Sequence, residues 1–245
     1  MVKSGFFFIL VASMAFFSLS AFTFSMDSRY VLSYLVFAQQ PQQTPEQTKK
    51  PAGGDTTLNL ESLIGHGSPY LGNKSTASAV VVDFSDFQCY LCKRHVDNAE
   101  RDLKSSFIQG GKVVYVFKHL PNRGLDSKNA AMAAQCANDQ GRFWDYHGLL
   151  YASQGPIDSG WVSPENLKVY ASKIKGIDMS EFDSCLDGKK HEEFVDGDIR
   201  FANSLGFTET PSFIIMDTKG LKIHKISGPK PFPIFKSLID GLETK

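Results

Sequence analysis

Two cysteines separated by two residues, Cys89 and Cys92, form the motif of this chain that is best suited to redox chemistry. An apolar stretch at 79–84 precedes the motif and a helical pattern follows it, so Cys89 is expected where a strand meets a helix. Amide groups in the first turn of a helix lack backbone partners and favour a thiolate there. We therefore interpret Cys89 as an exposed nucleophile and Cys92, one turn further along, as the thiol that pairs with it.

A Cys-x-x-Cys motif also occurs in zinc sites and in inert structural disulfides. A zinc site needs further ligands, but the other two cysteines, Cys136 and Cys185, stand apart from each other in the sequence, and no histidine follows either at ligand spacing. The pattern therefore favours a redox pair without a metal or any other cofactor. An inert disulfide between Cys89 and Cys92 stays open as the alternative.

The second pair of cysteines lies within two predicted helices, with Cys136 in 127–140 and Cys185 in 179–186. In an exported protein these two thiols could form a second disulfide. Such a bond would close a loop of about fifty residues, which corresponds to roughly 4 kcal/mol in the chain-entropy model. Two separate buried thiols are the alternative, since cysteine also packs well as a small apolar residue.

The N-terminal part of the chain differs in composition from the rest. Residues 5–24 carry no charge and are long enough to cross a bilayer, and a short apolar piece at 30–38 ends in a pattern that signal peptidase cleaves. We predict a signal peptide or membrane anchor over 1–38, a disordered linker over 39–66, and an extracytoplasmic location. The net charge of the 245 residues is zero, with no basic stripe, which argues against a nucleic-acid partner.

Strand and helix patterns alternate at both ends of the remaining sequence, which indicates an α/β fold. The first strand, helix and strand predict a parallel pair with a right-handed crossover, and the turn residues at 217–220 predict a hairpin. Strands are expected at 79–85, 112–118, 212–216 and 221–227, and helices at 89–107, 127–140, 143–152, 164–175, 179–186, 192–205 and 233–242.

Four separated stretches carry a family resemblance: residues 81–89 (VVDFSDFQC), Thr210-Pro211-Ser212-Phe213, residues 130–146, and residues 182–188. From about Gly67 onward the chain resembles the DsbA-like thiol:disulfide oxidoreductases, a branch of the thioredoxin superfamily. The resemblance implies a thioredoxin fold over 67–245 with an inserted helical domain at about 126–206. It also implies that Cys136 and Cys185 are the cysteine pair found in the inserted helices of exported members.

The resemblance also assigns roles to three residues near the Cys-x-x-Cys motif. The bond between Thr210 and Pro211 would be cis and its loop would face Cys89, where the backbone of Thr210 could bind an extended client segment as an added strand. Asp83 looks like the acid that family members bury beneath the active site, where it could relay a proton to or from Cys92. A trans proline and a solvent-exposed Asp83 at a sheet edge are the alternatives.

Two departures from the family pattern bear on redox strength. The dipeptide between the cysteines is Tyr-Leu, where strongly oxidising members carry proline and histidine, and Glu209 replaces a glycine often found before the Thr-Pro pair. We expect the helix-start amides, with Lys93 and Arg94, to lower the pKa of Cys89 below its ordinary value but not to the lowest values known. His95 is expected on the surface.

These features predict an exported, membrane-associated enzyme that donates disulfides to cysteine-containing client proteins. Cys89 would form the mixed disulfide with the client, and Cys92 would resolve it. By family resemblance, a quinone-linked membrane protein would reoxidise the pair. A reductase or isomerase of the same fold is one alternative. A non-catalytic module that binds a metal through Cys89 and Cys92 is another.

Overall fold

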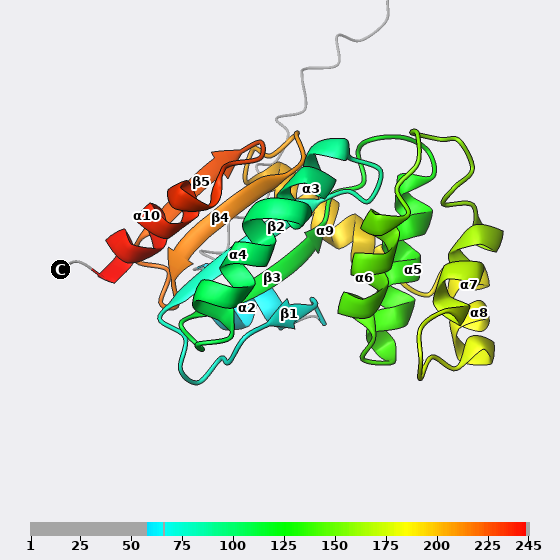
Figure 1. Ribbon diagram of the computed structural model, residues 1–245, viewed down its shortest axis with the longest axis horizontal. Coiled ribbons are helices and arrows are strands. Elements are labelled where there is room, and N and C mark those ends of the chain that lie inside the picture. The colour runs from blue at the N-terminus through cyan, green and yellow to red at the C-terminus, as the bar shows by residue number, and fades with distance from the viewer. Residues whose placement is uncertain (1–57, 66, 244–245) are drawn as a thin grey trace, which may run out of the picture. The chain divides into compact units, whose positions relative to one another are not determined.

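A mixed five-stranded sheet organises residues 58–65 and 67–243, the part of the chain that the computed structural model describes (Figure 1). The strands are β1 (Tyr70–Leu71), β2 (Ala79–Ser85), β3 (Val113–His119), β4 (Ser212–Asp217) and β5 (Ile223–Ser227), in the spatial order β1-β3-β2-β4-β5. β2 and β3 pair in parallel as predicted, whereas the other neighbours are antiparallel. β1 was not predicted, because two residues are too few to show a strand pattern.

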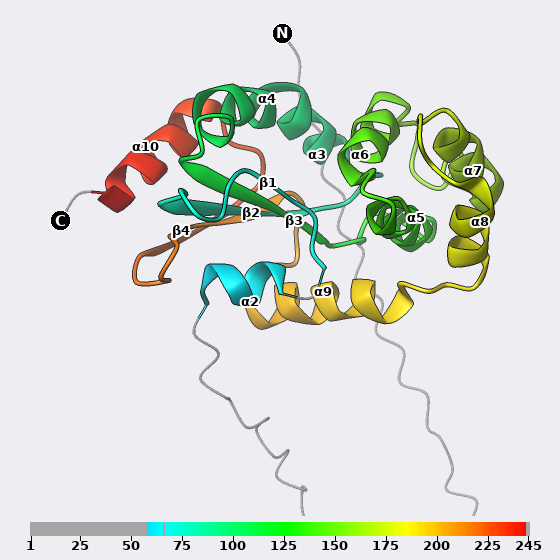
Figure 2. The ribbon, with the colours of Figure 1, turned by 90° about the horizontal axis from the view of Figure 1, so that it is seen from below.

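Helices cover both faces of the sheet (Figure 2). One face packs against α2 (Leu60–Ile64) and α9 (Glu192–Ser204). The other packs against α10 (Phe232–Glu243) and the continuous helix formed by α3 (Tyr90–His95), η2 (Val96–Glu100), α4 (Arg101–Leu103) and η3 (Lys104–Ile108). Because successive residues of a strand point to opposite faces, β2 supplies both cores and reads as a continuous apolar run interrupted by Asp83.

Four further helices form a separate core beside the sheet (Figure 1): α5 (Ser127–Asp139), α6 (Phe143–Ala152), α7 (Pro164–Ser172) and α8 (Met179–Asp187). The alanine-rich face of α5 packs there against aromatic side chains such as Tyr146 and Phe182. Phe87 and Cys92, at the end of β2 and the start of α3, belong to the same core. The helices between β3 and β4 therefore pack directly against the Cys-x-x-Cys motif.

The predicted linker over 39–66 is wrong at its C-terminal end, because residues 60–64 form α2. The side chain of Asn59 accepts a hydrogen bond from the Ser62 amide (2.9 Å), and the Ser62 hydroxyl accepts one from the Asn59 amide (3.1 Å). This reciprocal capping fixes the helix start, and the three apolar side chains of α2 are buried on the sheet. The helix was not predicted because it has only five residues and follows a polar tract.

The remaining N-terminal predictions fall outside the described residues. These are the signal peptide or anchor over 1–38 and the linker as far as residue 57. Within the described part of the chain, every helix is too short or too polar to cross a lipid bilayer.

A buried ion pair ties α9 to the end of β3. The Lys118 ammonium lies 2.9 Å from the Asp198 carboxylate and donates to the Ser68 hydroxyl at 2.7 Å. The His119 amide donates to the second Asp198 oxygen at 2.9 Å. Burial raises the pKa of Asp198, while the charge of Lys118 and these hydrogen bonds act in the opposite direction. The cost of burying each of these two charges is therefore compensated by the other charge.

We predict that Asp198→Ala lowers the free energy of unfolding by about 3 to 5 kcal/mol, because it leaves the Lys118 charge buried without a partner. Urea unfolding followed by circular dichroism measures the change. The double variant Lys118→Met/Asp198→Leu removes both charges and should be clearly more stable than Asp198→Ala alone. An unchanged urea midpoint for Asp198→Ala would show that the ion pair does not hold α9.

Candidate active site

The Cys-x-x-Cys motif lies where β2 ends and α3 begins, as the sequence pattern predicts. Cys89 is the cap residue before α3, with an extended backbone (φ −79°, ψ 113°). Its carbonyl oxygen accepts hydrogen bonds from the amides of Cys92 (3.0 Å) and Lys93 (3.1 Å). Both cysteines are free thiols. The two sulfurs thus belong to the cap and the first turn of one helix, the arrangement that a switch between dithiol and disulfide needs.

The expectation that Cys89 is exposed is wrong, because only 2% of the residue is accessible to solvent. It packs with Phe87 in the core shared with the inserted helices, and its sulfur lies 3.3 Å from the carbonyl oxygen of Thr210. Tyr90, the next residue, is 70% exposed. The helix start was predictable from local sequence, but the burial comes from segments that are distant in the sequence, the inserted helices and the loop of Thr210.

The two thiols have opposite pKa shifts. The pKa of Cys89 falls from 9.0 to about 5, chiefly because the Cys92 thiol donates a hydrogen bond to it; burial opposes the shift and Arg123 adds a favourable charge. The pKa of Cys92 rises well above 9.0, because the residue is buried and because its proton is held in that hydrogen bond. At neutral pH the pair therefore carries one thiolate, on Cys89, and one thiol, on Cys92.

The cation that acts on Cys89 is not one of those expected from the sequence. Lys93 forms an ion pair with Asp97, one turn further along the helix, at 3.0 Å. His95 is buried, contrary to expectation, and burial lowers its pKa to about 4, so it is neutral at physiological pH. Its Nε2 atom lies 3.0 Å from the Tyr115 hydroxyl. Arg123, from the loop after β3, supplies the positive charge instead.

The loop that contains Thr210 and Pro211 lies beside the motif. The peptide bond between these residues is cis, and the carbonyl oxygen of Thr210 is the atom 3.3 Å from the Cys89 sulfur. The Thr210 hydroxyl donates to the side chain of Asn122 (3.1 Å), whose amide group donates to the Thr208 carbonyl oxygen (3.0 Å). Asn122, which the sequence did not single out, therefore fastens this loop to the end of β3.

Asp83 is fully buried in the sheet, so the alternative of a solvent-exposed edge is wrong. One carboxylate oxygen accepts a hydrogen bond from the Ser85 hydroxyl (2.5 Å) and the other from the Tyr115 hydroxyl (2.8 Å). Burial raises the pKa of Asp83 from 3.8 to about 7, although both hydrogen bonds act to lower it. Its negative charge also raises the pKa of Cys92. The structure therefore places a carboxyl group that titrates near neutrality close to the buried thiol.

A buried polar chain leads from Asp83 toward solvent. The Tyr115 hydroxyl lies 3.4 Å from the carboxylate of Glu100, which is 1% exposed and lies in the π-helical turn η2. Lys104, whose side chain is 36% exposed, lies 2.6 Å from the other Glu100 oxygen. Neither Tyr115 nor Glu100 was predicted from the sequence. Glu100 could have been noticed as a carboxylate at helical spacing from Leu103 and hence on the buried face.

Asp86 fixes the loop that leads to Cys89. Its carboxylate accepts hydrogen bonds from the amides of Gln88 (2.8 Å), Asn122 (2.7 Å) and Arg123 (2.7 Å), and from the Ser127 hydroxyl (2.8 Å). Asp86 and Gln88 fall within the stretch that carries the family resemblance, but no role was predicted for either. One carboxylate thus joins the residues just before Cys89 with the segment that carries Arg123.

Comparisons with known proteins agree with this geometry. A family model described as thioredoxin matches residues 66–240. The probable disulfide bond formation protein D of Bacillus anthracis is 31% identical over 145 residues, 58% of this chain and 67% of that protein. The crystal structure of Wolbachia pipientis α-DsbA1 superposes with a TM-score of 0.61 at 25% identity, covering 71% of this chain and 90% of that one. The predicted thioredoxin fold with inserted helices is therefore confirmed.

A relative of another kind matches over a shorter share of its length. The Na⁺/H⁺ antiporter NhaA of Herminiimonas arsenicoxydans is 28% identical over 191 residues, which cover 78% of this chain and 28% of that protein. The transport in its name is therefore not carried over to this chain.

We predict that Cys92→Ala raises the pKa of Cys89 from about 5 toward that of an ordinary thiol, because it removes the main hydrogen-bond donor to the thiolate. Thiolate absorbance and alkylation rate across a pH series measure the change. Cys92→Ser, which keeps a donor, should raise the pKa less. The folded, reduced parent should also lose the stabilisation provided by its thiolate progressively as the pH falls from about 9.0, the ordinary thiol pKa, to about 5. A parent thiol that reacts only near the pH at which free cysteine ionises would contradict this account.

Proposed function

Since the chain belongs to the thioredoxin family, as one of its DsbA-like thiol:disulfide oxidoreductases, we propose that it donates disulfides to cysteine-containing exported proteins through Cys89 and Cys92. The low pKa of Cys89 is the observation that supports this direction. A stabilised thiolate favours the reduced form of the pair, so the oxidised form becomes a stronger oxidant.

The size of this effect follows from the pKa of Cys89. At pH 7, a thiol whose pKa is about 5 in place of 9.0 stabilises the reduced chain by about 3 kcal/mol. The oxidised chain has no thiolate and therefore has no such stabilisation. For a two-electron couple, this difference raises the reduction potential by about 60 mV above that of a pair with an ordinary pKa.

The proposed first step begins when a client thiolate attacks the sulfur of Cys89 in the oxidised chain. The bond between Cys89 and Cys92 breaks, a mixed disulfide forms between Cys89 and the client, and Cys92 leaves as a thiolate. Because the pKa of Cys92 is well above 9.0, this thiolate takes up a proton. Asp83, with a pKa of about 7, is the proposed donor.

In the second step a further client thiolate attacks the client sulfur of the mixed disulfide. The resolving role first expected for Cys92 belongs to the reverse direction, because attack by Cys92 on Cys89 would release the client thiol and undo the first step. The client gains its disulfide, Cys89 leaves as a thiolate, and the chain retains two electrons as one thiolate and one thiol. The low pKa of Cys89 makes it a good leaving group in this step. The loop at Thr210 and Pro211, beside the Cys89 sulfur, would hold the client backbone as an added strand.

Location and reoxidation complete the proposal. Residues 1–38 would export the chain or anchor it at the membrane, and the enzyme would act outside the cytoplasm, where disulfides persist. The two electrons would then pass to a quinone-linked membrane protein, as the family resemblance implies.

The reduction potential of the Cys89 and Cys92 pair tests the direction of transfer. We expect a value at or above that of protein disulfide isomerase, about −180 mV, from equilibration with glutathione. A value near that of thioredoxin, about −270 mV, would overturn the proposal in favour of a reductase. As controls for the site, Cys89→Ser should abolish exchange with a reduced model client. Cys92→Ala, which cannot form the internal disulfide, should accumulate a mixed disulfide when its Cys89 thiolate attacks a disulfide of an oxidised client.

We predict that Asp83→Asn slows the first step about 100-fold at low pH, the lower range for loss of a general acid. Because only protonated Asp83 can donate, the ratio of parent to variant rate should fall as the pH rises through about 7. Single-turnover oxidation of a model dithiol measures the ratio.

Ser85→Ala is the matched control for this variant. It keeps the carboxyl group but removes a hydrogen bond that lowers the pKa of Asp83, so the midpoint of the pH profile should move upward. Equal rates for parent and Asp83→Asn at every pH would leave Asp83 with a structural role only.

A further inference from the structure

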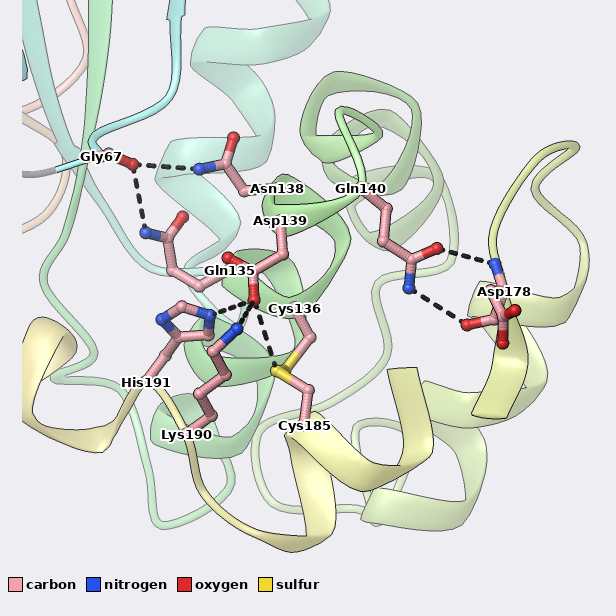
Figure 3. Close-up of polar contacts among 10 residues, drawn as sticks. All are labelled: Gly67, Gln135, Cys136, Asn138, Asp139, Gln140, Asp178, Cys185, Lys190 and His191. Carbon is pink, nitrogen blue, oxygen red and sulfur yellow. Dashed lines mark hydrogen bonds and ion pairs between the residues drawn. A yellow bond between two sulfur atoms is a disulfide. The ribbon is translucent and has the colours of Figure 1, made fainter. Parts of the chain in front are cut away.

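The second pair of cysteines lies in a cluster of metal-binding side chains (Figure 3). A disulfide joins Cys136 of α5 to Cys185 of α8. His191 lies just before α9, and the ligand atoms of Cys136, Cys185 and His191 all lie within 4.8 Å of one another. Asp139 follows Cys136 by one helical turn and points toward the same group.

From the sequence, no histidine was expected close enough to Cys136 or Cys185 to share a metal ion with them. The fold nevertheless places His191 beside both. The turn between α8 and α9 contains Lys189 in a left-handed conformation (φ 49°), and the Lys190 amide donates to the Cys185 carbonyl oxygen at 3.0 Å. The chain therefore folds back on the end of α8. As a result His191, six residues after Cys185, lies close to the disulfide.

The carboxylate of Asp139 lies beside Cys185 and His191, outside the group of three whose ligand atoms all lie within 4.8 Å of one another. One of its oxygens accepts hydrogen bonds from His191 Nε2 (2.8 Å) and Lys190 Nζ (2.8 Å), and lies 3.9 Å from the Cys185 sulfur. These two hydrogen bonds hold the Asp139 carboxylate beside the disulfide, where it is placed to act as a ligand.

An ion can reach this group from solvent. A surface cavity of about 880 Å³ is lined by both cysteines, Asp139 and Lys190, together with Gln140 and residues of α8. The Asp139 side chain is 32% exposed and that of His191 is 14% exposed, whereas Cys136 is buried at 1%. The site thus combines an entry path with partly buried ligands, the conditions that a structural metal site requires.

We propose that Cys136, Cys185, His191 and Asp139 bind Zn²⁺ when the two cysteines are reduced, so that zinc and the disulfide are alternative links between α5 and α8. Two thiolates, one imidazole and one carboxylate are tetrahedral zinc ligands. With Zn–S bonds of about 2.3 Å, the two sulfurs would lie about 3.8 Å apart, which is within the present size of the cluster.

The charges of the proposed site balance. Two thiolates and the Asp139 carboxylate exceed the charge of Zn²⁺ by one negative charge, and the Lys190 ammonium, now 2.8 Å from Asp139, compensates for it. His191 would bind as neutral imidazole and exchange its contact with Asp139 for one with the metal. The proposal uses none of the residues around Cys89.

The two states interconvert by a balanced two-electron reaction. A newly made chain has both thiols, and Zn²⁺ displaces their two protons when it binds. A disulfide oxidant then takes two electrons from the two zinc-bound thiolates and two protons from solvent and becomes two thiols, while the Cys136–Cys185 bond forms and Zn²⁺ leaves. A dithiol reductant drives the reverse reaction and is itself oxidised to a disulfide.

The test uses the full-length chain with Cys89→Ser and Cys92→Ser, so that the other cysteine pair cannot bind metal. Zn²⁺ binding is measured by competition with a chromophoric chelator, before and after reduction with a dithiol that is then removed. We expect one Zn²⁺ per chain in the reduced form and none in the oxidised form. Co²⁺ in place of Zn²⁺ should give the absorption of a tetrahedral site with two thiolates.

Variants separate a built site from adventitious binding. His191→Ala and Asp139→Asn, in the same background, should each weaken Zn²⁺ binding at least 10-fold. His224→Ala, at an exposed histidine of β5, is the matched control and should leave binding unchanged. If reduction unfolds the chain, Zn²⁺ should restore its far-ultraviolet circular dichroism. Absent binding, equal binding in the oxidised form, or insensitivity to His191→Ala would each overturn the proposal.

Discussion

The hydrogen bond from the Cys92 thiol to the Cys89 thiolate is the interaction on which the redox site depends. It is the largest contribution to the low pKa of Cys89, and burial of Cys92 keeps the donated proton in place. The helix supplies the geometry, because three residues of separation put both sulfurs at its first turn. Burial of Cys92 raises its own pKa, and the proton that Cys92 keeps stabilises the Cys89 thiolate, so the pKa of Cys89 is low.

The rest of the site holds this pair between groups that come from distant parts of the chain. Asp86 binds the segment after β3, which carries Arg123, and Asn122 on that segment binds the loop of Thr210. The inserted helices pack apolar side chains on the same core as Cys89, so this residue is shielded although it caps the start of a helix. Asp83 lies beneath, with its charge suppressed by burial.

The two cysteine pairs of the chain differ in their surroundings rather than in their own chemistry. Cys89 and Cys92 are almost fully buried and next to an acid that holds its proton up to about pH 7. Cys136 and Cys185 are also buried, but they line a surface cavity, beside a carboxylate, an ammonium group and an imidazole. The first setting suits proton-coupled thiol exchange, and the second suits a choice between a disulfide and a metal ion.

The α/β character, the order of most strands and helices, and the position of Cys89 where a strand meets a helix could all be predicted from the sequence. These features depend on periodicity and on neighbours within one or two turns, which local sequence records. The burial of Cys89, the action of Arg123 on it in place of Lys93, and the position of His191 beside Cys136 emerged only from the folded chain. Such contacts join residues far apart in the chain, and burial and long-range charge leave no local pattern from which they could be inferred.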